Sequence, residues 1–227
     1  MRLLVISDLH GKIDTLDALD ERFKAADAVV FAGDFARFAH EETGLPALEA
    51  LCAKHGTIFS VIGNCDPPSF LAEVQRRGIS VEGSVRQWQG LRFAGSGGGS
   101  VFTGTTPNEK TEQELAADFE SLSGAAAGEG GDLVLIMHNP PKDTACDVVS
   151  SGAHVGSGCF KALIEKLEPL LVVTGHIHES AAICQVGKTV VMNPGALLEG
   201  KYGQVELERT GDVWQVVKAE LCSFCSL

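Results

Sequence analysis

Long apolar runs are missing from the 227-residue sequence. A membrane-spanning helix needs about 20 consecutive apolar residues, and no segment approaches that length. The N-terminal segment MRLLVISDLHG has only a short apolar run before Asp8, which is too short for the hydrophobic region of a signal peptide. We therefore expect a cytoplasmic protein with no membrane partner.

Positive charge is also scarce. The chain has 18 lysines and arginines against 30 aspartates and glutamates, which gives a formal net charge of −12. Non-specific binding to nucleic acid or to an anionic membrane needs a cationic surface, so we expect neither. An anionic substrate would have to be attracted locally, and bound metal cations could supply that attraction.

The seven cysteines do not form the pattern of a disulfide framework. They are scattered along a chain without an export signal, and thiols stay reduced in the cytoplasm. The last two, Cys222 and Cys225, have zinc-type spacing, but no second pair accompanies them. A thiol-based redox function rests on this pair alone and is a weak alternative.

Short β-branched runs alternate with amphipathic segments, a pattern typical of βα units around a sheet covered on both faces. After residue 180 the pattern favours antiparallel strands, and the glycine-rich segment 123–131 favours a surface loop. We expect one domain over residues 1–227, with a mixed sheet or two stacked sheets between helical layers. The strand order stays open. The expected strands are 2–7, 28–33, 57–63, 132–137 and 170–175, with shorter strands over 79–95, and the expected helices are 12–25, 45–55, 68–77, 109–122 and 156–169, the last capped by Ser157.

Each expected buried strand is followed by a side chain that can bind a metal. In a parallel sheet the carboxyl ends of the strands lie at one edge, where open α/β sheets bind their ligands. Seven oxygen and imidazole donors would therefore converge from five segments. They are Asp8, His10, Asp34, Asn64, His138, His176 and His178.

These donor types suit divalent cations, with imidazole favouring Zn, Fe or Ni and oxygen donors favouring Mn or Mg. Seven side chains exceed the need of one ion, whereas two ions that share a carboxylate would use them all. Taken singly, each residue has a structural explanation as a cap, a turn residue or a satisfied buried histidine. Their common position at strand ends makes coincidence a poor account of the whole set.

Five short motifs resemble the signature blocks of the calcineurin-like metallophosphoesterases in order and spacing. They are DLH (8–10), GD (33–34), GNCD (63–66), the histidine of MHNPP (137–141) and GHIH (175–178). The compact chain is most similar to the small bacterial and archaeal members, with GNCD in place of GNH(D/E).

The resemblance implies a four-layer α-β-β-α sandwich of two mixed β-sheets flanked by helices. It also implies metal-dependent hydrolysis of phosphodiester or phosphomonoester bonds in small substrates, nucleotides included. A protein phosphatase is the alternative within the same chemistry, and the absent histidine and the lack of longer insertions disfavour it. A non-catalytic protein-binding scaffold is another, which the complete set of ligand positions disfavours. The oligomeric state stays open, with a homo-oligomer among the alternatives.

The family pattern further implies how the ligands are divided. One metal would be held by Asp8, His10 and His178, and a second by Asn64, His138 and His176, with Asp34 bridging the two. The two divalent ions would be Mn, Fe, Ni or Zn. A hydroxide bridging the ions would then attack the phosphorus in line.

Cys65 stands where many family members have a histidine thought to protonate the leaving oxygen. A thiol is a weak hydrogen-bond donor with a pKa of about 8.5, against about 6.5 for imidazole, so we expect a slower enzyme or a preference for good leaving groups. A nucleophilic role for Cys65 is disfavoured, because this segment lacks the arginine-bearing phosphate loop of cysteine phosphatases. Asp66 is the second candidate catalytic residue. It would orient a metal ligand or accept a proton, or else cap the helix that starts near Pro67.

Overall fold

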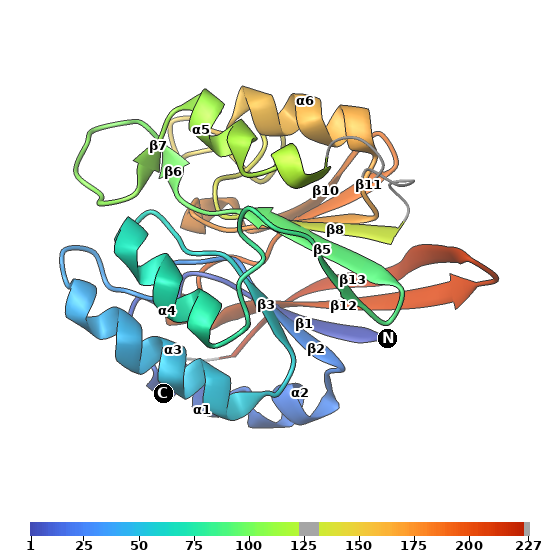
Figure 1. Ribbon diagram of the computed structural model, residues 1–227, viewed down its shortest axis with the longest axis horizontal. Coiled ribbons are helices and arrows are strands. Elements are labelled where there is room, and N and C mark those ends of the chain that lie inside the picture. The colour runs from blue at the N-terminus through green and yellow to red at the C-terminus, as the bar shows by residue number, and fades with distance from the viewer. Residues whose placement is uncertain (123–131, 225–227) are drawn as a thin grey trace.

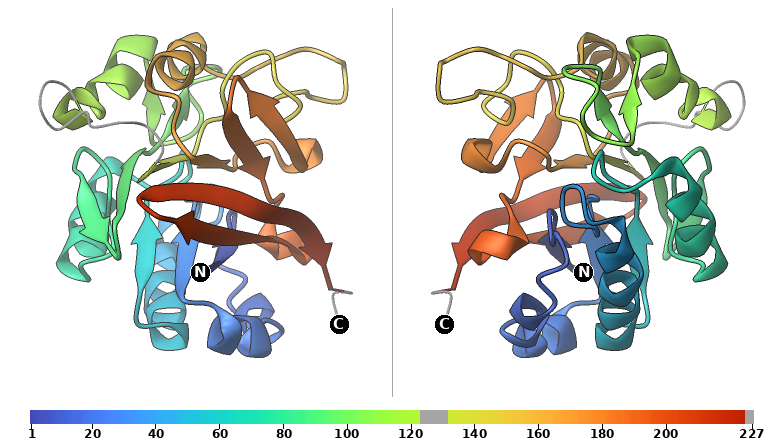
Figure 2. Two further views of the ribbon diagram at one scale, coloured as in Figure 1. Left: turned by 90° about the vertical axis from the view of Figure 1, so that its right-hand side faces the viewer. Right: turned by 90° about the vertical axis from the view of Figure 1, so that its left-hand side faces the viewer.

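The computed structural model describes residues 1–122 and 132–224. Two large β-sheets pack face to face, with helices on both outer faces (Figures 1 and 2). The expected four-layer α-β-β-α sandwich is therefore confirmed. The predicted loop at 123–131 and Cys225 lie outside the described residues.

The first sheet has the strand order β13-β12-β1-β2-β3. Its three N-terminal strands are parallel to one another, and the long C-terminal hairpin joins them in antiparallel fashion. The strands are β1 (Arg2–Ile6), β2 (Ala28–Phe31), β3 (Ile58–Ser60), β12 (Lys201–Thr210) and β13 (Val213–Ser223).

The second sheet has the order β10-β11-β9-β8-β5-β4. Strands β5, β8, β9 and β11 are parallel, and an antiparallel strand lies at each edge. The strands are β4 (Arg86–Trp88), β5 (Leu91–Ser96), β8 (Leu133–Met137), β9 (Leu171–Thr174), β10 (Ala182–Val186) and β11 (Thr189–Asn193), and a separate short pair joins β6 (Gly99–Ser100) to β7 (Glu109–Lys110).

Apolar side chains fill the space between the sheets and the space beneath each helical layer. Phe59 of the first sheet stacks on Phe93 of the second, with ring centroids 3.7 Å apart. Helices α1 to α4 cover the first sheet and α5 and α6 the second (Figure 1). They are α1 (Asp14–Asp17), α2 (Asp20–Ala25), α3 (Gly44–Lys54), α4 (Leu71–Arg76), α5 (Glu112–Ala117) and α6 (Gly158–Leu167).

Several helix boundaries differ from the sequence-based prediction. The helix expected over 12–25 is two short helices, because the backbone of Leu19 (φ −102°, ψ 8°) leaves the helical region between them. The helix expected over 109–122 begins only at Glu112, since Thr111 forms a capping box with Glu114 and the two residues before it pair with β6. The predicted N-cap is confirmed, because the Ser157 side chain accepts the backbone N–H of Phe160.

Candidate metal centre

The seven candidate ligands lie where the parallel strands of both sheets end. Asp8 and His10 follow β1, Asp34 follows β2, and Asn64 lies in the loop after β3. The other three come from the second sheet: His138 directly follows β8, and His176 and His178 lie in the loop and short 3-10 turn after β9.

The backbone is unusual at four of these seven positions. Asp8, His10, Asp34 and His176 have φ angles of 57°, 46°, 61° and 66°. Residues other than glycine rarely adopt this left-handed backbone conformation, and such residues concentrate at functional sites. The turn after β1 and the turn after β2 hold each other in place, because the N–H groups of Leu9 and His10 both donate to the Asp34 carbonyl at 3.0 Å.

Asp8, His10 and His178 form a first cluster of donors. The Nε2 atoms of the two histidines lie 3.2 Å apart, and the Nε2 of His178 lies 3.3 Å from Asp8 Oδ1. Two imidazole nitrogens that face each other beside a buried carboxylate define a point where a cation would be bound by all three.

Asn64 and His138 form a second cluster. The Asn64 Oδ1 atom lies 2.9 Å from His138 Nε2. The ring of His176 lies beside that of His138, with centroids 5.3 Å apart. The structure thus brings the three residues together. His176 joins the cluster through this ring contact, and its place as a ligand stays a prediction.

Asp34 lies between the two clusters. Its Oδ2 atom is 3.5 Å from His10 Nε2 on one side and 3.5 Å from His138 Nε2 on the other. Its Oδ1 atom accepts the backbone N–H of Cys65 at 2.8 Å, which fixes the orientation of the carboxylate. The Asp34 carboxylate is therefore close to both clusters.

Hydrogen bonds at the far side of two rings select the tautomer that can bind a metal. His138 Nδ1 lies 2.6 Å from the carbonyl oxygen of Ala32, and His10 Nδ1 lies 3.1 Å from that of Ala36. A carbonyl only accepts, so each Nδ1 carries a proton, and Nε2 is the ring nitrogen that faces the site and could bind a metal.

The electrostatics of the site favour a bound cation. Burial opposes ionisation of Asp34, but the charge of His138 outweighs it and holds the pKa of that carboxyl below its usual range. Burial likewise disfavours the charged form of His138, yet the nearby carboxylates raise its pKa to about 9. Two buried carboxylates need positive charge nearby, and here they favour a proton on the neighbouring imidazole. Divalent ions would supply that positive charge instead.

Three glycines have no Cβ and so make room for the side chains of the two clusters. A Cβ on Gly63 would lie 1.9 Å from Asp34 Oδ1, and one on Gly33 would lie 2.8 Å from His138 Nδ1. A Cβ on Gly175 would lie 2.7 Å from Asp8 Oδ2. Each of these glycines directly precedes a candidate ligand and belongs to one of the motifs GD, GNCD and GHIH.

Cys65 and Asp66, the two candidate catalytic residues, have different surroundings. Burial and the charge of Asp34 raise the pKa of the Cys65 thiol far above its usual value, so the group stays protonated. Asp66 is fully buried and accepts the backbone N–H groups of Gly63, Phe35 and Ala36. It therefore joins the Asp34 loop to the Asn64 loop. It does not cap the following 3-10 turn, which starts after Pro67 without a side-chain cap.

Burial and the charge of Asp34 raise the pKa of Asp66 to about 7, although its three N–H donors oppose the rise. A group enclosed in this way is placed to hold the two ligand loops at a fixed separation. A catalytic role for Cys65 or Asp66 remains a prediction.

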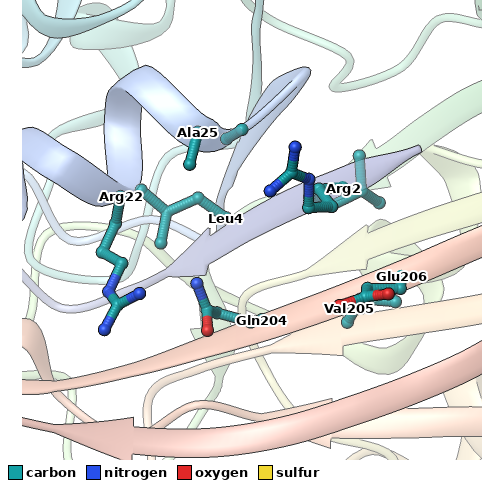
Figure 3. Close-up of a pocket in the computed structure, with 9 residues that line it drawn as sticks. Arg2, Leu4, Arg22, Ala25, Gln204, Val205 and Glu206 are labelled. Atoms are coloured by element: carbon teal, nitrogen blue, oxygen red, sulfur yellow. The ribbon is translucent and has the colours of Figure 1, made fainter.

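Two of the surface hollows among the described residues differ in their relation to the candidate ligands. One, of about 670 Å³, adjoins His10 and His178. The other, of about 200 Å³, lies between α2 and the first sheet, where Arg2, Arg22 and Gln204 line it (Figure 3). None of the candidate ligands lines the second hollow.

Comparison with known proteins identifies the family of this chain. A sequence model of the calcineurin-like phosphoesterases matches residues 1–180. The uncharacterized protein MJ1162 of Methanocaldococcus jannaschii is 31% identical over 200 residues, which cover 86% of this chain and 88% of the relative. The protein therefore belongs to the calcineurin-like phosphoesterase family, whose members are metal-dependent hydrolases of phosphoric esters.

Solved structures support the same fold. The protein TT1561 of Thermus thermophilus matches with a TM-score of 0.72 at 20% identity, over 98% of both chains. A dimetal phosphatase from Danio rerio matches with a TM-score of 0.66 at 10% identity, again over 98% of both chains. Among residues 1–122 and 132–224, no helix is long and apolar enough to cross a membrane.

Proposed function

We propose that this protein hydrolyses phosphodiester or phosphomonoester bonds of small phosphorylated substrates with two divalent cations bound about Asp34. The observation that carries the proposal is the position of that carboxylate, 3.5 Å from a histidine of each donor cluster. Asp8, His10 and His178 would hold one cation, and Asn64, His138 and His176 the other.

Two divalent ions in such a site neutralise phosphoryl oxygens and make a water nucleophilic at neutral pH. The chain's own contribution is position. Asp34 is held by the N–H of Cys65, and the rings of His10 and His138 are oriented by backbone carbonyls. A site fixed in this way needs little reorganisation as the reaction proceeds, which is the main source of catalysis in phosphoryl transfer.

The donor set leaves room for an anionic substrate. Two carboxylates against four histidines and one asparagine would leave two divalent cations with a residual positive charge. In a chain of net charge −12, this local charge would be the attraction for a phosphate. We also propose a cytoplasmic location, where the six free cysteines of the described residues would stay reduced.

The test is hydrolysis of bis-p-nitrophenyl phosphate and p-nitrophenyl phosphate by protein supplied with Mn²⁺, Ni²⁺ or Mg²⁺, with and without a chelator. We expect turnover with at least one metal and its loss with chelator. Asp34→Asn should lose both metals and the activity, while Cys52→Ser, which changes a half-buried thiol on α3, should lose neither. Absence of turnover with every metal would favour the non-catalytic scaffold.

A further inference from the structure

The larger hollow adjoins the first donor cluster. Two of the candidate ligands, His10 and His178, line it. A group in this hollow is therefore within reach of anything held at the cluster. We name it the Phe38 pocket, and its lining residues are His10, Gly11, Lys12, Arg37, Phe38, Thr43, His178 and Leu198.

Phe38 lines the pocket, and 50% of its surface is exposed to solvent. It lies in a tight turn where Arg37 and His40 pair as an isolated bridge and Ala39 has a φ angle of 57°. The Thr43 hydroxyl closes the turn, because it accepts the Arg37 N–H at 2.8 Å and donates to the His40 carbonyl at 2.7 Å. These hydrogen bonds fix the turn that places the Phe38 ring in the lining of the pocket.

Leu198 lines the pocket with Phe38 and is also anchored to the metal loops. Its N–H donates to the carbonyl of Asp8 at 3.1 Å, and its own carbonyl accepts from Lys12 Nζ at 3.2 Å. Leu198 is thus attached to the backbone that carries Asp8. Its distance from the cluster is set before a ligand arrives, which lowers the entropy lost on binding.

Positively charged residues of the Phe38 pocket favour an anionic ligand. Lys12 and Arg37 both line the pocket and are exposed. In a chain with 12 more acidic than basic residues, two cationic side chains beside a phosphate site add a local attraction for anions. The pocket therefore combines a nearby site for a phosphoryl group, an apolar ring and positive charge.

We propose that the Phe38 pocket binds the organic group of the phosphoester and selects esters that carry a planar ring, such as aryl or nucleobase groups. This inference rests on the proposed function, since the phosphoryl group must be held by cations at the first cluster. Phe38 stacks on the ring or meets it edge to face, Leu198 packs against it, and the phosphoryl group lies toward His10 and His178. Phe38 is a specificity-determining residue in this account.

The test compares binding of phenylphosphonate and methylphosphonate to the Mn²⁺-loaded protein by isothermal titration calorimetry. Neither compound has an ester bond to the alkyl or aryl group, so binding is measured without turnover. We expect phenylphosphonate to bind about fivefold more tightly, the scale of an aromatic pair. Phe38→Ala should remove this preference and leave methylphosphonate affinity unchanged. Phe102→Ala is the matched control, because Phe102 is 88% exposed and does not line the pocket.

The outcomes separate the pocket from the metal site. Equal affinities in the wild type, or a phenyl preference that survives Phe38→Ala, would overturn the ring pocket while methylphosphonate binding still supported the phosphoesterase function. Cyclohexylphosphonate binding as tightly as phenylphosphonate would overturn the selection for a planar ring. Absence of binding by all three compounds, together with absence of hydrolysis, would overturn both proposals.

Discussion

Gly63→Ala is expected to disable the site by displacing Asp34 without removing any donor. An ideal Cβ at position 63 would lie 1.9 Å from Asp34 Oδ1 and 2.3 Å from Asp34 N, and real Cβ atoms essentially never approach another heavy atom within 3.0 Å. The contact must therefore open by about 1.1 Å. Because the backbone nitrogen is also in the way, a rotation of the Asp34 side chain cannot relieve the clash.

A displacement of this size moves the carboxylate relative to both donor clusters. Misplacement by about 1 Å typically costs on the order of 10²-fold in rate. We expect kcat for bis-p-nitrophenyl phosphate with Mn²⁺ to fall by about that factor, and the metal content, measured by inductively coupled plasma mass spectrometry, to fall below two ions per chain. Circular dichroism would check that the variant is folded.

Gly56→Ala is the matched control. Gly56 lies between α3 and β3, a Cβ there would meet nothing within 4 Å, and its φ, like that of Gly63, is outside the left-handed region. The two substitutions therefore differ only in the space available. A Gly63→Ala protein with normal kcat and a full metal content would refute the idea that this glycine makes room for the Asp34 carboxylate.

Three further predictions concern residues around the site. Cys65→His should keep the metal content and raise kcat on esters with poor leaving groups by up to about 10²-fold, because imidazole can donate a proton that the Cys65 thiol releases poorly; an unchanged kcat would show that protonation comes from elsewhere. Asp66→Asn should lower the free energy of unfolding in urea by about 1–3 kcal/mol, because an amide NH2 would replace one of the two carboxylate oxygens and leave at least one of the three backbone N–H groups without its acceptor; an unchanged value would contradict its role in joining the loops. The pKa of Glu109 is lowered from 4.5 to about 2 by the N–H groups of the loop it anchors. The contribution of its carboxylate to folding stability should therefore be complete above pH 4.5 and be lost as the pH falls through about 2. A midpoint near pH 4.5 in an NMR titration of the Glu109 carboxyl carbon would contradict the lowered pKa.

Much of the fold follows from local pattern. β2, β8 and β9 are buried along their whole length, and such strands appear in the sequence as continuous β-branched and apolar runs. The candidate ligands were found for the same reason, since the end of a buried strand is visible in the sequence. The convergence of their side chains is what the structure adds.

Other features depend on contacts between distant segments and have no local signal. Asp66 looks like a helix cap beside Pro67, yet it accepts N–H groups from residues about 30 positions earlier. Glu109 and Lys110 favour a helix locally but pair with β6 instead. Phe38 follows no periodic pattern, and its place beside His178 depends on how the two sheets pack.

Anomalous diffraction from crystals soaked in Mn²⁺ would test the central claim most directly. The account predicts two peaks about 3.5–4 Å apart on either side of the Asp34 carboxylate, one near His10 and His178 and the other near Asn64 and His138. Both peaks should disappear in Asp34→Asn. A single peak that leaves Asp34 uncoordinated, or two peaks that persist in Asp34→Asn, would contradict a pair of cations shared by this carboxylate.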